Sequence, residues 1–328
     1  MPGETDPLNM KEMTFDLVEV ALGDRSYDVV IGPGALQLVS DYVPSQARRV
    51  AIVTQRNIGV EIDPGIESKV FYMGNGEQEK SLATVERLCR EFVTFGLTRA
   101  DVVIAIGGGV VTDCVGFAAA SYHRGVDLIN IPTTLLGQVD AAIGGKTGID
   151  IPEGKNLVGA FHWPARVVLD ETLLETLPER EWRQGRAEVV KTQLLAGHEL
   201  DVRGAAAFKA AVCLQDPHDH GPRRFLNLGH TFAHALEAAA DFNLPHGEAV
   251  ALGLLAALRL SGRETGDVER ELAPQPVKVD LERAWEALLR DKKRTGDAIN
   301  VVVLGDDGPR VEERSAPDVR RELERLIA

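Results

Sequence analysis

The stretch of sequence that decides the fold is DVVIAIGGGVVTD, which runs from Asp101 to Asp113. The part from Val102 to Ile106 is entirely apolar, as expected for a strand buried on both faces of a parallel sheet. Gly107, Gly108 and Gly109 follow it, and the small residues after them predict a helix to about Tyr122. A strand, a glycine turn and a helix in this order indicate one unit of an open, mostly parallel sheet.

The same alternation of strands and helices continues on both sides of this unit. It predicts a parallel sheet with helices on both faces for the residues before about 170. We expect further strands at Ser26–Ile31, Arg49–Thr54, Lys69–Tyr72 and Asp127–Ile131, and helices from Ala35 and over Ser81–Phe95.

From about Leu173 the strand patterns nearly vanish, and Ala, Leu, Glu and Arg dominate. The sequence therefore predicts an α/β N-terminal domain with a Rossmann-like parallel sheet, residues 1–172, and a mostly α-helical C-terminal domain, residues 173–328. In the second domain we expect helices at Glu179–Leu195, Thr231–Ala240, Gly247–Ser261, Leu281–Arg290 and Pro317–Ile327, a strand at Ala298–Leu304 and a loop over Gly262–Asp280.

The composition excludes several classes of protein. The formal net charge of −14 argues against a nucleic-acid partner, because phosphate backbones are bound by clustered Lys and Arg. No apolar run approaches the roughly 20 residues of a membrane span, and the polar N-terminus does not resemble a signal peptide. Three widely spaced cysteines, Cys89, Cys114 and Cys213, indicate free thiols in a reducing compartment. We expect a soluble, cytoplasmic protein without membrane contact.

Two kinds of glycine-flanked segment are candidates for phosphate binding. Gly107–Gly109 precedes a helix N-terminus, whose unpaired N–H groups attract a diphosphate, although the stretch is not G-x-G-x-x-G and a tight turn is an equal alternative. Lys146 and Lys155 each follow glycine, in segments expected to be loops past strand ends, where ligands of such sheets bind. Solvated surface lysines are the alternative. Asp140 could orient a lysine or a substrate hydroxyl.

The helical half contains a cluster of residue types that bind metals. His230 and His234 are four positions apart and share a helix face, His246 opens the next expected helix, and Glu188 lies on an earlier one. One carboxylate and two histidines with open positions suit a catalytic zinc or similar ion. A single histidine here would more often be packed or capping, but three within one short stretch favour a site.

Together these segments resemble the dehydroquinate synthase family of sugar phosphate cyclases. The resemblance covers nearly the whole chain from about Val50. It rests on GGGVVTD (Gly107–Asp113), YHRGV (Tyr122–Val126), IPTTLLGQVDAAIGGKTGI (Ile131–Ile149), GKNLVGAF (Gly154–Phe161), LPERE (Leu177–Glu181), AEVVK (Ala187–Lys191), LNLGHTFAHALE (Leu226–Glu237), LPHGEAVALG (Leu244–Gly253) and DKK (Asp291–Lys293).

The resemblance implies the fold of that family and a role for each matching residue. The implied metal ligands are Glu188, His230 and His246. The implied substrate-binding and catalytic residues are Arg124, Asp140, Lys146, Asn156, Lys191, Lys209, Arg223, Asn227, His234 and Lys292, with Lys209 and Arg223 on the substrate carboxylate. The implied NAD-binding residues are Asn75, Gly76, Glu77, Gln78, Glu79, Lys80, Gly109, Val110, Val111, Thr112, Asp113, Thr133, Thr134, Lys146, Lys155, Leu173, Leu174, Glu175 and Thr176.

The implied activity is that of a phosphate-eliminating lyase of the shikimate pathway, which leads to chorismate and the aromatic amino acids. The family converts 3-deoxy-D-arabino-heptulosonate 7-phosphate to 3-dehydroquinate and phosphate. Transient oxidation by NAD, phosphate elimination and an intramolecular aldol closure make the ring, with zinc, or cobalt as the alternative, as Lewis acid. A homodimer is implied too, because Arg124 would reach the phosphate in the neighbouring subunit's active site.

Several alternatives remain open on the sequence alone. They are an aminodehydroquinate synthase or another sugar phosphate cyclase, an NAD- and metal-dependent alcohol dehydrogenase, and a non-catalytic relative. Three features depart from the family pattern. Gln55 replaces the usual acid after the second strand, Pro217 replaces another acid, and the segments from Lys191 to Lys209 and from Ser261 to Asp291 are short.

Overall fold

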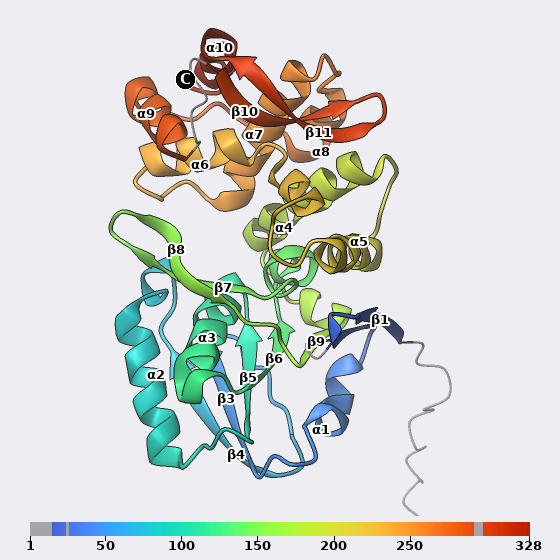
Figure 1. The fold of residues 1–328 in the computed structure, drawn as a ribbon, viewed down its shortest axis with the longest axis vertical. Helices are drawn as coiled ribbons and strands as arrows, with labels where there is room; N and C mark the ends of the chain where they lie inside the picture. Colours follow the sequence, from blue (N-terminus) through green and yellow to red (C-terminus); the bar gives the residue numbers. More distant parts are fainter. Residues whose placement is uncertain (1–14, 24–25, 292–297) are drawn as a thin grey trace, which may run out of the picture.

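The computed structural model describes residues 15–23, 26–291 and 298–328. A seven-stranded sheet in the order β1-β2-β9-β6-β5-β3-β4 forms the lower part of the molecule in Figure 1. Every neighbouring pair is parallel except β1 and β2, which confirms the predicted α/β parallel-sheet fold. The strands are β1 (Asp16–Val20), β2 (Tyr27–Ile31), β3 (Arg49–Gln55), β4 (Glu67–Met73), β5 (Val102–Gly107), β6 (Asp127–Pro132) and β9 (Arg166–Leu169). The short strands β1 and β9 were not predicted.

Both faces of the sheet are covered. The helices α2 (Leu82–Phe95) and α3 (Gly109–Ser121) bury Phe92 and Val115 against the strands on one face. The 3₁₀ turn η2 (Ala35–Leu38) and the short helix α1 (Val39–Tyr42) bury Val39 on the other. Every residue of β5 is buried, which is the reason for its unbroken apolar run.

We predicted loops for the segments that carry Lys146 and Lys155. In the structure these segments are instead the two strands of a hairpin. β7 (Lys146–Ile151) pairs antiparallel with β8 (Gly154–Phe161), and an irregularity lies between Ile149 and Ile151. The glycines that suggested loops are needed by the hairpin itself. A side chain at Gly159 would meet the backbone oxygen of Thr147 at 2.1 Å. Figure 1 shows the hairpin above α3, between the sheet and the helical half.

The residues after 170 are mostly helical, as predicted. The turn η6 (Glu171–Leu174) leads to α4 (Glu179–Ala196), α5 (Val202–Gln215), the turn η7 (Pro222–Asn227), α6 (His230–Ala239), α7 (His246–Leu260), α8 (Gly266–Leu272), α9 (Leu281–Asp291) and α10 (Ala316–Glu324). Strands β10 (Ala298–Gly305) and β11 (Gly308–Ser315) form a second hairpin. The helix α5 and the strand β11 were not predicted, and α8 lies where a loop was expected. The domain boundary near residue 172 stays a prediction.

The core of the helical half explains where its helices pack. α7 is buried along most of its length, and it lies against α6 at a point without side chains, because a Cβ on Gly253 would meet the oxygen of Gly229 at 2.2 Å. α5 instead packs Ala206 and Ala210 against β2 and β9, so this helix joins the helical half to the sheet. Within residues 15–23, 26–291 and 298–328, no helix combines the length and the hydropathy of a membrane span.

Candidate metal and substrate site

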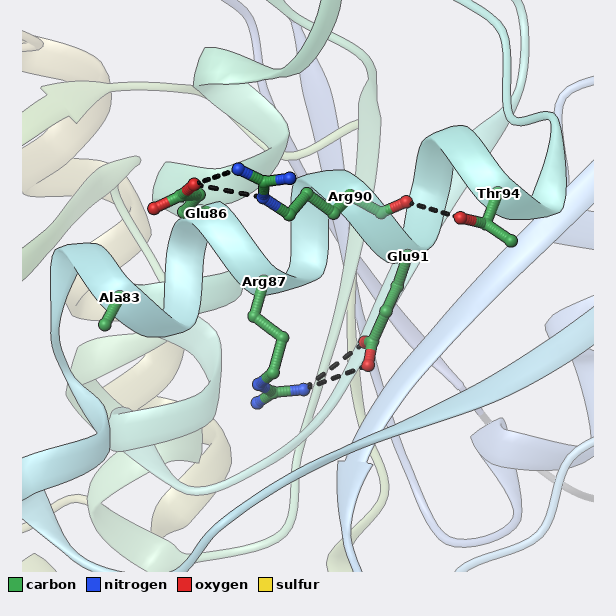
Figure 2. Close-up of a pocket in the computed structure, with 6 residues that line it drawn as sticks. All are labelled: Ala83, Glu86, Arg87, Arg90, Glu91 and Thr94. Carbon is green, nitrogen blue, oxygen red and sulfur yellow. Dashed lines mark hydrogen bonds and ion pairs between the residues drawn. The ribbon is translucent and has the colours of Figure 1, made fainter.

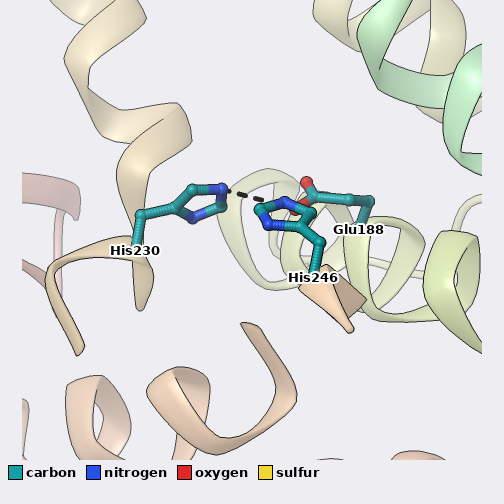
Figure 3. A group of neighbouring side chains, drawn as sticks. All are labelled: Glu188, His230 and His246. Atoms are coloured by element: carbon teal, nitrogen blue, oxygen red, sulfur yellow. Dashed lines mark ion pairs between the residues drawn. The ribbon is translucent and has the colours of Figure 1, made fainter. Parts of the chain in front are cut away.

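Glu188, His230 and His246 converge where α4, α6 and α7 meet, as Figure 3 shows. The Nε2 atoms of His230 and His246 lie 3.4 and 3.5 Å from Oε1 of Glu188. One ligand atom from each side chain lies within 4.8 Å of the others. The exposed fraction rises from 1% for the Glu188 side chain to 29% for His246, so the cluster opens on the His246 side.

Each histidine ring has a hydrogen-bond partner at Nδ1, the ring nitrogen that does not face Glu188. Nδ1 of His230 lies 3.2 Å from the backbone oxygen of Leu228, and Nδ1 of His246 lies 3.3 Å from Oε1 of Glu237. Both partners are acceptors, so in each ring Nδ1 carries the proton and donates. A neutral ring then has its lone pair on Nε2, directed toward Glu188. A carboxylate or carbonyl behind a histidine in this way is the usual arrangement around a bound metal.

These three residues fit a divalent ion by their spacing and by their chemistry. Burial and the Lys191 ammonium lower the pKa of His230 to about 3, so its Nε2 is a bare acceptor that faces another acceptor, the carboxylate of Glu188. A cation between them removes this conflict. Ligand atoms about 2 Å from a tetrahedral zinc lie about 3.3 Å apart, close to the separations found here.

Lys191 lies one helical turn after Glu188, and its ammonium forms an ion pair with Oε2 of that residue. Both side chains are almost fully buried. Burial alone would raise the pKa of Glu188, but Lys191 and the two histidines hold it well below its ordinary value. The carboxylates of Glu188 and Asp140 raise the pKa of Lys191 against the effect of burial. Glu188 is therefore ionised, and Lys191 adds a positive charge beside it.

Gln184 fixes α4 against the start of α7. It lies one turn before Glu188, and its Oε1 accepts a 2.6 Å hydrogen bond from the backbone N–H of Gly247. A Cβ on Gly247 would lie 2.4 Å from Cα of Gln184, so only glycine permits this approach. The contact places His246, the preceding residue, opposite Glu188.

The predicted substrate residues form two further groups near this centre. Lys209 on α5 donates a 2.7 Å hydrogen bond to the backbone oxygen of Asp140 and pairs with its carboxylate. Asp140 belongs to the π-helical turn η5 (Gly137–Ala141), and the charges of Lys209 and Lys191 lower its pKa although burial would raise it. His234 lies beside His230, with ring centroids 5.4 Å apart. Asn227, half-buried, ends η7 just before α6.

The other group lies at the base of the β7–β8 hairpin. Nζ of Lys146 lies 2.6 Å from Oδ2 of Asp219. The guanidinium of Arg223 donates to the backbone oxygens of Gly144 and Pro217, at 2.8 and 2.9 Å. Asp216 accepts the backbone N–H groups of His220, Gly221 and Arg223, which fixes the loop before η7. Two cationic side chains are thus held near one another by fixed partners.

The segment predicted to bind NAD contains a dense ion cluster around Lys80. This buried ammonium lies 2.9 Å from Oδ2 of Asp113 on α3 and 2.6 Å from Oδ1 of Asn156 on β8. It also lies 3.8 Å from Oε1 of Glu77, in the turn η3 (Glu77–Glu79) after β4. Together these contacts tie the ends of β4 and β5 to the hairpin.

The remaining NAD candidates line the same edge of the sheet. Gly109–Asp113 begin α3, Thr133 and Thr134 follow β6, and 173–176 lie at η6. Some of these side chains make contacts within the protein that stabilise its fold. Glu79 accepts from the N–H of Gly74 at 3.2 Å and from the hydroxyl of Thr84 at 3.3 Å, and Leu174 is buried. Gln78 donates to the oxygen of Asn75 within the turn that Gly76 opens. Gln55 donates to the oxygen of Gly74 at 2.7 Å, so it fixes this loop.

Arg124 takes no part in the contacts described above. Arg124 is exposed on η4 (Tyr122–Arg124), and none of the ion pairs found among the described residues joins it to the other candidates. Lys292 lies outside the described residues, and its role stays a prediction.

Sequence reasoning missed three acids, namely Glu237, Asp150 and Asp219. Asp150 accepts the backbone N–H of Asn156 at 2.8 Å, and Asp219 pairs with Lys146. Glu237 had a detectable signal, because it lies seven positions after His230, on the same face of α6. The partners of Asp150 and Asp219 depend on hairpin and loop geometry, which no sequence period specifies.

A shallow depression on the outer face of α2 is unrelated to this site. It is lined by Ala83, Glu86, Arg87, Arg90, Glu91 and Thr94 (Figure 2). Glu86 and Arg90, like Arg87 and Glu91, form exposed ion pairs one helical turn apart. Such pairs contribute only a few tenths of a kcal/mol to helix stability, and we assign this surface no chemistry.

Comparison with known proteins decides the family. The family models described as 3-dehydroquinate synthase N-terminal and C-terminal match residues 70–184 and 167–294. The chain belongs to the 3-dehydroquinate synthase family. A 3-dehydroquinate synthase of Nitrobacter winogradskyi is 41% identical over 82% of this chain and 79% of its own length. One of Rhodopseudomonas palustris, strain BisB18, is 43% identical over 80% of this chain and 78% of its own. A protein of Amycolatopsis mediterranei assigned as an aminodehydroquinate synthase is 41% identical over 94% of both chains.

Solved structures of sugar phosphate cyclases have the same fold as this family member. The 2-epi-5-epi-valiolone synthase of Streptomyces hygroscopicus, solved with NAD⁺ and Zn²⁺, is 27% identical and matches with a TM-score of 0.79 over 92% of this chain and 96% of its own. A 2-deoxy-scyllo-inosose synthase, solved with carbaglucose-6-phosphate, NAD⁺ and Co²⁺, matches with a TM-score of 0.84 at 22% identity, over 95% of this chain and all of its own. The predicted fold, a Rossmann-like sheet domain followed by helices, is confirmed.

Proposed function

We propose that this protein is a 3-dehydroquinate synthase, which converts 3-deoxy-D-arabino-heptulosonate 7-phosphate to 3-dehydroquinate and phosphate. The observation that carries the proposal is the buried carboxylate of Glu188 between the Nε2 atoms of His230 and His246, at 3.4 and 3.5 Å. Cationic side chains suited to a polyanionic substrate surround it, with Lys191 beside Glu188 and Lys209, Lys146 and Arg223 further out.

Glu188, His230 and His246 would hold a divalent ion, zinc or cobalt, and the edge of the sheet around Lys80 would hold NAD. Together these two groups supply Lewis acidity toward a hydroxyl and its ketone, and a reversible acceptor for a hydride. Zinc suits one carboxylate and two imidazoles with an open position. The wider exposure of His246 leaves the substrate a side from which to reach that position.

The protein's own residues would bind and orient the substrate. Lys209 and Arg223 would hold its carboxylate, and Lys146, Asn156, Lys191, Asn227 and His234 its phosphate and hydroxyls. Ion pairs with Asp140 and Asp219 hold Lys209 and Lys146 in place in the absence of substrate. Fixed cations of this kind favour one cyclisation-ready conformation of a flexible anion, which lowers the entropic part of the barrier.

The NAD site would use the η3 turn, the start of α3 and the hairpin. The backbone N–H groups at the start of α3 suit a diphosphate. Glycine is required there for packing as well, because a Cβ on Gly107 would lie 2.5 Å from Cγ2 of Val111. Lys80 and Lys155 bring positive charge to the same edge.

An aminodehydroquinate synthase is the second candidate, and one observation favours it. The chain matches the Amycolatopsis protein over 94% of both lengths, whereas it matches the Nitrobacter and Rhodopseudomonas enzymes over 73–82%. This chain and the relative assigned to the amino substrate are thus of similar length. A heptulosonate phosphate with an amino group in place of a hydroxyl would present the same carboxylate and phosphate to this site.

The test is incubation of the purified protein with the heptulosonate phosphate, Zn²⁺ and a catalytic amount of NAD, followed by simultaneous assay of phosphate and dehydroquinate. Equal release of both without accumulation of NADH would support the synthase. Net NADH would indicate an alcohol dehydrogenase instead. If the heptulosonate phosphate gave no product while its amino analogue did, the second candidate would replace the first. His246→Ala serves as the inactive control.

A cytoplasmic homodimer is part of the same proposal. Arg124 is exposed on η4, so its guanidinium can contact a neighbouring subunit. Mass measurement by light scattering would test the dimer directly. Mixing Arg124→Ala with Lys146→Ala subunits tests the shared site. Hybrid dimers should regain activity, since one of their two sites combines an intact Arg124 with an intact Lys146. Activity no higher than that of the separate variants would contradict a shared site.

A further inference from the structure

An ion relay crosses from the cofactor edge of the sheet to the metal centre. Oε1 of Glu237, the atom that holds Nδ1 of His246 at 3.3 Å, also lies 3.6 Å from Nζ of Lys155. The same Nζ lies 3.8 Å from Oε1 of Glu77, which in turn lies 3.8 Å from Nζ of Lys80. Four side chains from η3, β8, α6 and α7 thus form a continuous path from Glu77 to His246.

The members of this relay are not ordinary surface charges. The Glu237 side chain is only 4% exposed, and Lys155 is 22% exposed. A buried carboxylate needs compensation, and among the described residues Lys155 is the cation paired with Glu237, while the His246 ring donates to it. Loss of the Lys155 charge would therefore leave the Glu237 carboxylate to be compensated by His246 and His234, and change how firmly the His246 ring is held.

Lys155 is shared between two carboxylates that belong to different sites. On one side it holds Glu237 behind a metal ligand. On the other it helps Lys80 to neutralise Glu77, in the segment proposed for NAD. Anything that changes the position of Glu77 or Lys155, including a dinucleotide bound at this edge, also changes the partner of Glu237. The two sites then have a physical route by which each affects the other.

We propose that Glu237 is a positioning residue for His246, and that Lys155 couples metal affinity to NAD affinity through Glu237. This inference rests on the proposed function, which supplies the metal and NAD sites. It adds that the two cofactors do not bind independently. By linkage, the factor by which NAD changes the metal dissociation constant equals the factor by which the metal changes that of NAD.

The experiment is a titration of the full-length, metal-free protein with Co²⁺, followed by the visible ligand-field absorption, with and without saturating NAD. The spectrum reports the coordination of the ion and not the overall stability of the fold. We compare the unchanged protein with Glu237→Gln, Lys155→Met and a control, Glu248→Gln. Glu248→Gln is the same chemical change as Glu237→Gln. Glu248 lies on α7, two positions after His246, but its side chain is exposed.

In Glu237→Gln we expect Co²⁺ to bind roughly 10- to 100-fold more weakly, with an altered spectrum, as for other partners of metal-bound histidines. Glu248→Gln should bind like the unchanged protein. In the unchanged protein NAD should shift the Co²⁺ dissociation constant by about 5-fold or more, and in Lys155→Met this shift should vanish while Co²⁺ still binds.

Three results would overturn the inference. Glu237→Gln could bind Co²⁺ as tightly as the control, with the same spectrum. The NAD-induced shift could persist in Lys155→Met. Or the unchanged protein could bind both ligands without any mutual effect, which would leave the proposed function intact and remove the relay alone. Failure of the unchanged protein to bind either ligand would instead refute the proposed function and the relay with it. Lys155→Met, a change on a partly exposed strand, keeps the test valid if Glu237→Gln does not fold.

Discussion

Lys209 and Asp140, 69 positions apart, form one of the links between the helical half and the sheet half at the site. Nζ of Lys209 donates a 2.7 Å hydrogen bond to the backbone oxygen of Asp140 and also pairs with its carboxylate. α5 brings the lysine there because its alanines pack against β2 and β9. The contact therefore serves the fold as well as the proposed substrate site.

Lys209→Met should lower the free energy of unfolding by about 1.5–3 kcal/mol, the range for a hydrogen bond to a charged group. Asp140 would lose the charge that stabilises its carboxylate, and methionine preserves most of the side-chain volume. Urea denaturation measures the change. Lys278→Met, an exposed lysine after α8, should stay within about 0.5 kcal/mol of the unchanged protein. Equal stability of the two variants would show that the pair contributes nothing.

Gly247→Ala should destabilise the protein by about 1–3 kcal/mol and weaken metal binding, because the new methyl group would overlap the backbone of Gln184. α7 would have to move away from α4, and His246 would move away from Glu188. Thermal unfolding and a zinc titration measure the two effects. Gly266→Ala at the start of α8 is the matched control, since a Cβ there meets nothing within 4 Å. A Gly247→Ala protein with unchanged zinc affinity would contradict the proposed rigid contact.

Lys146→Ala should reduce kcat/KM by about 10- to 200-fold, which corresponds to the loss of one charge-assisted bond, while NAD affinity stays nearly the same. Lys146 pairs with Asp219 and is half-exposed, whereas the cluster of Lys80 at the proposed NAD site contains Asp113, Asn156 and Glu77. Steady-state kinetics and a fluorescence titration with NAD separate the two properties. A parallel loss of NAD affinity would mean that Lys146 acts mainly on the cofactor.

Zinc binding at pH 7 should release about one proton, and the source should be His246. Burial disfavours the charged ring, but hydrogen bonds and charges from Glu188 and Glu237 outweigh it and raise the pKa of His246 to about 10. His230, with its pKa lowered to about 3, has no proton to release. Calorimetry in buffers of different ionisation enthalpy counts the protons. His246→Ala should retain no zinc by elemental analysis, and an enthalpy independent of buffer would contradict the assignment.

The metal-free protein should lose stability as the pH rises from 7 toward 10. The pKa of His246 is raised in the folded protein, so the contribution of its charged contacts is fully present below pH 6.5 and is lost as the pH passes through about 10. Thermal unfolding of the metal-free protein at several pH values measures this slope. In Glu237→Gln the slope should be smaller, because one of the two carboxylates that favour the charged ring has become neutral. An identical slope in both proteins would exclude His246 as its source.

The sequence alone predicted most of the fold of the sheet half. The apolar run before Gly107 had one plausible structure, a strand buried on both faces, and β5 is buried throughout. The hairpin β7–β8 was missed, because its glycines imitate a loop and become understandable only when the close approach of Gly159 to Thr147 is known. α5 was missed as well. Its apolar positions do not form a simple stripe, since it packs on the sheet and on η5 together.

For the candidate site, the sequence by itself determined the residue types and their local placement. A glycine next to His230 and another next to His246, and the four-residue spacing of His230 and His234, depend only on neighbouring residues and on the helical period. The partners were decided by the tertiary structure. Glu237 reaches His246 because α6 and α7 pack closely at Gly229 and Gly253, and Lys155 reaches Glu77 and Glu237 because the hairpin lies between them. Contacts between distant segments depend on how whole elements pack, and no local pattern in a sequence specifies that packing.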